Sequence, residues 1–99
     1  MPLTSSQIRH LRALSHSLKP VVMVGQQGLK DSVIQELEGA LDAHELLKVK
    51  VSAGDREERD ELIAELASRT GAELVQRIGH VAVLFRRNLK KPRVVLPSG

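Results

Sequence analysis

The chain has no cysteine and no long apolar run. Without thiols it can form no disulfide framework, thiolate zinc site, iron–sulfur cluster or cysteine nucleophile. A membrane-spanning helix needs about 20 mostly apolar residues, and the opening Met1–Thr4 is not a basic-then-apolar signal peptide. We therefore expect a cytoplasmic protein, and its 99 residues suit a single domain over 1–99.

Aromatic side chains are also nearly absent, since Phe85 is the only one in the chain. RNA recognition motifs and OB-folds bind nucleic acid bases by stacking them on aromatic rings. Both of these classes are therefore disfavoured. A single aromatic residue in a β-rich segment is expected to lie in the core.

Acidic residues are missing from both ends of the chain. Residues 1–30 hold four Lys or Arg and no acid, and residues 74–99 hold six and no acid. All twelve acids lie between Asp31 and Glu73, with only five cations among them. If the two ends meet in space, they form a basic surface that can attract a polyanion such as a phosphate backbone.

Helical patterns occur three times. Thr4 and Gln7 form a capping box before an amphipathic segment at about residues 5–17. A second apolar stripe runs from the glycine pair to about residue 43. Asp55 and Glu58 form another capping box, and the helix that follows them ends at Gly71.

Four segments have the character of strands. Residues 21–24 form a short apolar run, and residues 47–51 alternate between apolar and polar side chains. Residues 73–78 and 81–86 are separated only by Gly79 and His80, which predicts a tight hairpin. The expected fold is an α/β two-layer sandwich, with an N-terminal helix followed by β-α-β-α-β-β and a four-stranded mixed sheet. After about residue 88 the chain is basic, and residues 94–96 form either an edge strand or a frayed end.

The motif with the clearest chemical meaning is Gly25-Gln26-Gln27-Gly28, between a predicted strand and a predicted helix. Glycines let another backbone approach closely, and the start of a helix favours an anion. KH domains clamp RNA backbone with such a GxxG loop. The alternative is a plain strand-to-helix turn. The loop has neither the third glycine of a dinucleotide site nor the Lys-Ser/Thr of a phosphate-binding P-loop.

Other candidate sites are weak. His10, His16, His44 and His80 do not have the spacing of a helical metal site. The acids between Asp55 and Glu65 alternate with arginines, as on a solvated helix face. No arrangement supplies both a nucleophile and a base. We therefore expect no catalytic site, no metal, no cofactor and no enzymatic activity.

Three runs of residues resemble the CRM domain (chloroplast RNA splicing and ribosome maturation), in its stand-alone bacterial YhbY-like form. They are Leu18 to Leu29, Glu36 to Val51, and Thr70 to Gly79, and the similarity extends over about residues 3–96. The resemblance implies an RNA-binding domain similar in fold to the C-terminal domain of bacterial translation initiation factor 3. It further implies association with ribosomal RNA in precursors of the large ribosomal subunit.

The same resemblance implies an RNA-binding surface around the glycine loop. Its residues are Gly25, Gln26, Gln27 and Gly28, with the cations Lys19, Lys30, Lys48, Lys50, Arg77, Arg86 and Arg87. We expect a monomer whose partner is RNA. The alternative is an adaptor protein whose acidic middle segment binds a ribosomal protein or an assembly factor.

Overall fold

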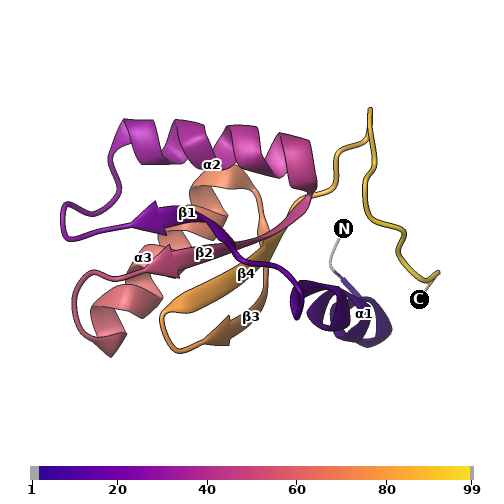
Figure 1. Cartoon of the computed structure of the whole chain (residues 1–99), viewed down its shortest axis with the longest axis horizontal. Helices are drawn as coiled ribbons and strands as arrows, with labels where there is room; N and C mark the ends of the chain where they lie inside the picture. The colour runs from indigo at the N-terminus through magenta and orange to yellow at the C-terminus, as the bar shows by residue number, and fades with distance from the viewer. Residues whose placement is uncertain (1–2, 99) are drawn as a thin grey trace.

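A computed structural model describes residues 3–98, which form three helices and four strands (Figure 1). The helices are α1 (Ser5–Ser15), α2 (Asp31–His44) and α3 (Arg56–Thr70). The strands are β1 (Pro20–Val24), β2 (Leu46–Val51), β3 (Glu73–Ile78) and β4 (Val81–Phe85). Their order along the chain is the predicted one, and most boundaries lie within two residues of those expected.

The four strands form one mixed sheet in the order β1-β2-β4-β3. β1 and β2 are parallel and are joined through α2, while β4 is antiparallel to both β2 and β3. The hairpin between β3 and β4 turns at Gly79, whose φ of +57° lies in the left-handed region that favours glycine. The prediction of a four-stranded mixed sheet is confirmed.

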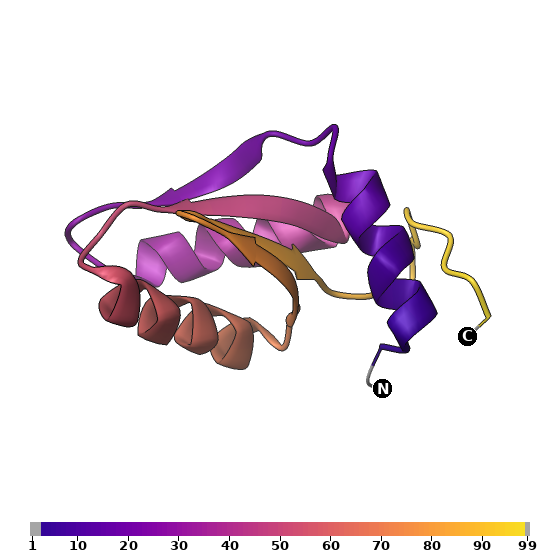
Figure 2. The same ribbon diagram turned by 90° about the horizontal axis from the view of Figure 1, so that it is seen from below.

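The two faces of the sheet are covered differently. α2 and α3 both pack against the same face, as a two-layer sandwich requires (Figure 2). The core between the layers includes Val24, Leu37, Leu41, Val49 and Leu66, all of them fully buried. The α/β two-layer sandwich is thereby confirmed.

The opposite face of the sheet is covered only at one end, by α1. Leu11 of α1 is fully buried there against Leu46, Val83 and Phe85. The capping box at Thr4 is present and fixes the start of α1. This second, smaller core leaves the other end of the same sheet face open, and that end lies beside the glycine loop.

The last residues form neither an edge strand nor a frayed end. Val94 and Leu96 pack against the smaller core, although residues 86–98 belong to no helix or strand. The amide side chain of Gln7 also donates to the carbonyl oxygen of Pro97 at 3.0 Å. The basic tail therefore follows a defined path across the end of the molecule.

Candidate nucleic-acid interface

The glycine loop lies where β1 ends and before α2 begins. It closes as a turn in which the amide of Gly28 donates to the carbonyl oxygen of Gly25 at 3.1 Å. Gly28 has a φ of +75°, so this position requires glycine for conformational reasons. Gly25 has no such need, and a Cβ added there would meet no atom within 4 Å. The absence of a side chain at Gly25 therefore leaves open space for a ligand.

The start of α2 supplies partial positive charge beside this loop. Lys30 is the N-cap residue, and no side chain caps the first turn. Such a helix start presents backbone amides without intrahelical partners, and the helix dipole favours an anion nearby. The Lys30 side chain is exposed at the same place. Lys30 therefore lies just after the glycine loop at the start of α2, and its role in binding stays a prediction.

The open sheet face adjoins the loop and carries two lysines. Val49 and Val51 point into the main core, so Lys48 and Lys50 project from the other face of β2. Lys50 pairs with Met23 on β1 and with Val81 on β4, and Val81 pairs with Ile78 on β3. One row of side chains thus crosses all four strands. We call Met23, Lys50, Val81 and Ile78 the open-face row.

The open-face row lies close to the glycine loop and combines apolar area with charge. Met23 is 62% exposed and Ile78 is 56% exposed. Met23 precedes Gly25 by two residues, so Lys50 stands beside the end of β1 that leads into the loop. At the same end, Nδ1 of His80 lies 3.3 Å from the carbonyl oxygen of Val51. Backbone turns, one imidazole and one lysine therefore gather at this end of the sheet.

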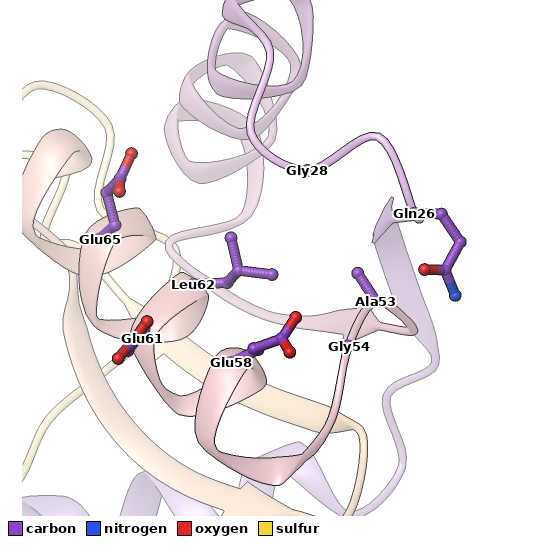
Figure 3. Close-up of a pocket in the computed structure, with 8 residues that line it drawn as sticks. All are labelled: Gln26, Gly28, Ala53, Gly54, Glu58, Glu61, Leu62 and Glu65. Carbon is purple, nitrogen blue, oxygen red and sulfur yellow. The ribbon is translucent and has the colours of Figure 1, made fainter.

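The other side of the glycine loop faces α3 and is acidic. A cleft of about 310 Å³ separates them, and its lining includes Gln26, Gly28 and three glutamates of α3 (Figure 3). These glutamates are Glu58, Glu61 and Glu65. Their carboxylates would repel a phosphate that entered from this side. A polyanion can approach the loop favourably from the open sheet face.

Lys19 lies away from the loop, although it was among the cations predicted to lie around it. Lys19 precedes Pro20, at the opposite end of β1 from Gly25. A five-residue strand is about 16 Å long at about 3.3 Å per residue. The predicted proximity was wrong because a strand between two residues separates them, whereas a turn would bring them together.

Arg77 and Arg86 are held by acidic side chains on the helical side of the sheet. Nε of Arg77 lies 2.9 Å from the Asp60 carboxylate of α3. Arg86 bonds Glu38 at 2.7 Å and Asp42 at 2.8 Å, and it also donates to the carbonyl oxygen of Thr70. Burial alone lowers the pKa of Arg86, but its bonds to both carboxylates outweigh burial and raise it. We exclude both arginines from the interface because their charges are already neutralised.

Glu45 is a structural residue that the sequence patterns did not single out. It follows α2 with a φ of +60°, and its side chain is fully buried. Its carboxylate accepts backbone amides of Asn88, Arg93 and Val94 at 2.5–2.7 Å. Arg87 lies 3.7 Å from the same carboxylate and donates to the carbonyl oxygen of Val94. Arg87 therefore belongs to the tail and lies away from the glycine loop.

Within residues 3–98, no group of three or more His, Asp or Glu side chains is arranged to hold a metal ion. None of the helices in that part of the chain is long and apolar enough to cross a membrane. The features that remain are a backbone loop, a helix start, lysines and an apolar strip. This arrangement suits the backbone of a polyanion better than a small cofactor.

The fold and the glycine loop are those of a small α/β domain. Comparison with known proteins identifies its family. Residues 3–86 match the model of the CRS1 / YhbY (CRM) domain, and the chain belongs to this family. It is 42% identical to Probable RNA-binding protein PA4753 of Pseudomonas aeruginosa, over 91% of this chain and 86% of that protein. It is 43% identical to an RNA-binding protein of Haemophilus influenzae, over 96% and 95% of the two chains.

A solved structure also resembles this fold along its length. The hypothetical protein SAV1595 from Staphylococcus aureus, for which RNA binding has been suggested, superposes with a TM-score of 0.82. The two sequences are 33% identical, and the match covers 97% of this chain and all of the other. The predicted resemblance to the CRM family is confirmed.

Proposed function

We propose that this protein binds RNA backbone at the end of the sheet where the glycine loop meets the open-face row. The observation that carries the proposal is the position of Gly25, which has no neighbour within 4 Å of its missing side chain. Lys50 of β2 pairs with Met23 of β1, two residues before Gly25. Family relatives named as RNA-binding proteins support the same ligand class.

The distribution of charge selects the side from which RNA approaches. Lys48 and Lys50 project from the open sheet face, while Glu58, Glu61 and Glu65 border the cleft on the helical side. RNA on the open face would neutralise phosphates with lysines and release counterions. With Phe85 buried, the contacts fall on backbone and shape, so modest sequence selectivity is expected.

We further propose that the RNA is ribosomal RNA in precursors of the large subunit, and that the protein assists subunit assembly as a cytoplasmic monomer. The support is the resemblance of the chain to the stand-alone bacterial members of its family. A non-enzymatic role fits a site built from a loop, cations and apolar side chains, since none of these supplies a nucleophile with a base.

A binding experiment tests the site residue by residue. The protein is titrated into a fluorescent RNA hairpin, and the variants Gly25→Ala, Lys50→Gln and Gln26→Asp/Gln27→Asp are compared with the parent. Gly25→Ala adds one methyl group in open space, so reduced affinity with an unchanged fold would report close approach of RNA. Arg56→Gln is the matched control for Lys50→Gln, because it removes an exposed cation from the acidic helix α3.

Affinity should fall for the three loop and sheet variants and stay constant for Arg56→Gln. Loss of one phosphate contact at Lys50 should reduce the slope of log affinity against log salt by about 0.7–0.9. Equal effects of Lys50→Gln and Arg56→Gln would mean that only total charge matters. Binding unchanged by both Gly25→Ala and the double aspartate variant would exclude the loop.

Sedimentation distinguishes RNA binding from the adaptor alternative. Ribosomal particles from cells that contain the tagged protein are separated in a gradient, with and without RNase treatment. Release by RNase supports an RNA partner, whereas retention after complete digestion supports binding to a ribosomal protein. The proposed association with large-subunit precursors predicts that the protein migrates with those precursors and is absent from small-subunit fractions.

A further inference from the structure

A second basic site lies in residues 88–93, which we call the tail loop. It contains Lys90, Lys91 and Arg93, and all three side chains are exposed. None of the three forms an ion pair with any residue in the described range 3–98. The tail loop also lies beyond residues 3–86, the part of the chain that matches the family model.

Two side chains hold the tail loop in one conformation. The buried Glu45 carboxylate accepts hydrogen bonds from the backbone amides at both ends of the tail loop, Asn88 and Arg93. Inside the loop, Oδ1 of Asn88 accepts the amides of Lys90 and Lys91, each at 3.1 Å. Nδ2 of Asn88 donates in turn to the carbonyl oxygen of Asp42 at 2.9 Å. A loop fixed in this way loses little conformational entropy when it binds a partner.

Two acids that form hydrogen bonds with the tail loop, Glu45 and Asp42, are already paired with arginines. Arg87 lies against the Glu45 carboxylate, which is fully buried. Asp42 is bonded to Arg86 at 2.8 Å. The cations of the tail loop therefore face solvent without a competing free carboxylate on these two neighbours, and their outward field is positive.

The tail loop and the glycine loop lie at opposite ends of the molecule. Figure 1 shows the connection from β1 to α2 at one end of the longest axis and the C-terminal segment at the other. The extent along that axis is 39 Å. A duplex advances about 3.4 Å per base pair in B-DNA and somewhat less in RNA, so about 15 base pairs would cover this length.

We propose that the tail loop binds the phosphate backbone of a second segment of the RNA that occupies the glycine loop. This inference rests on the proposed RNA-binding function. The protein would then contact one folded RNA at two sites and favour RNAs long enough to reach both. Joining two contacts in one ligand raises affinity without any new chemistry at either site.

The experiment compares two RNA hairpins, with stems of about 5 and about 20 base pairs, of which only the longer can span both sites. Lys90→Gln/Lys91→Gln removes two cations and keeps the backbone amides that Asn88 binds. Lys90→Arg/Lys91→Arg is the control that keeps the charge. Glu45→Gln weakens the hydrogen bonds that hold the tail loop and removes one negative charge from the protein. Glu36→Gln removes one negative charge at an exposed position of α2.

For the long hairpin, Lys90→Gln/Lys91→Gln should weaken binding on the order of 10-fold at about 0.1 M salt and reduce the slope of log affinity against log salt by about 1.4–1.8. The arginine variant should bind like the parent. Glu45→Gln should bind more weakly than Glu36→Gln although their charges are equal. The short hairpin cannot reach both sites at once. The affinities of the parent and of Lys90→Gln/Lys91→Gln for it should therefore differ less than their affinities for the long hairpin.

Equal affinity of the parent and Lys90→Gln/Lys91→Gln for the long hairpin would overturn the second site. If Gly25→Ala still weakened binding in that case, the proposed RNA-binding function would stand without it. If the parent bound neither hairpin, both proposals would fail together. If the tail loop bound an acidic peptide while Lys90→Gln/Lys91→Gln left the affinity for the long hairpin unchanged, the tail loop would be assigned to a protein partner.

Discussion

Glu45 accepts the backbone amide of Val94 at 2.7 Å, across 49 positions of sequence. This bond joins the end of α2 to the C-terminal segment and seats Val94 against the smaller core. The φ of +60° at Glu45 is unfavourable for a residue with a side chain, and such strain costs about 1–3 kcal/mol. The hydrogen bonds of the buried carboxylate offset that cost.

Replacing this carboxylate should release the tail. We expect Glu45→Gln to lower the free energy of unfolding by about 2 kcal/mol, because an amide cannot accept three backbone donors as well as a carboxylate does. Urea denaturation measures the loss, and limited proteolysis within residues 88–96 measures detachment. Glu36→Gln should change neither the free energy of unfolding nor the proteolysis of the tail. Equal stability of the two variants would contradict the role of Glu45 in holding the tail.

The contribution of Glu45 to stability should depend on pH. Burial alone raises the pKa of its carboxyl, but the amides of Asn88, Val94 and Arg93, together with the charge of Arg87, lower it below the usual 4.5. A carboxyl with a lowered folded pKa stabilises the protein above the unfolded pKa, and this stabilisation is lost as pH falls through the folded value. The difference in unfolding free energy between the parent and Glu45→Gln should be full at neutral pH and small near pH 2.

Arg86 and Lys50 should behave oppositely when each is replaced by glutamine. Arg86 links α2 to the end of α3 through charged hydrogen bonds, so Arg86→Gln should lower stability by about 2 kcal/mol. Its effect on the RNA affinity of the folded protein should be small. Lys50→Gln should leave the thermal midpoint nearly unchanged and weaken RNA binding. A strong loss of RNA affinity in the folded Arg86→Gln variant would show that Arg86 takes part in RNA binding.

Substitution of the two glycines of the loop should affect stability differently. Gly28→Ala forces a left-handed conformation on a residue with a Cβ, which costs about 1–2 kcal/mol of stability. Gly25→Ala meets no atom within 4 Å and should change stability by less than about 0.5 kcal/mol. Chemical denaturation of both variants checks this order. Comparable destabilisation would mean that Gly25 has a structural role.

The fold was predictable from sequence because its signals are local. The alternation around Lys48 and Lys50 fixes which face of β2 is buried, and the capping residues Thr4 and Asp55 mark the starts of α1 and α3. The glycine loop could also be located, because two glycines followed a buried strand and preceded an apolar stripe. Each of these features depends on residues that are close in sequence.

The partners of individual charges could not be predicted in the same way. Arg86 meets Glu38 across 48 positions, and Glu45 meets the tail at a similar separation. Such contacts depend on how the helices lie on the sheet and on the path of a segment without regular structure. The one local signal for Glu45 was its position after a helix, where a glycine is commoner. Basic residues near the chain end therefore looked equivalent until their partners were known.

NMR mapping shows which face of the protein RNA contacts. The ¹⁵N-labelled protein is titrated with an RNA hairpin, and backbone amide shifts are followed along the whole chain. We expect the largest changes at Gly25–Gly28 and at Lys48 and Lys50, with little change along α3 from Arg56 to Glu65. The largest changes on that acidic helix, with the glycine loop and the open-face row unaffected, would contradict the proposed RNA-binding site.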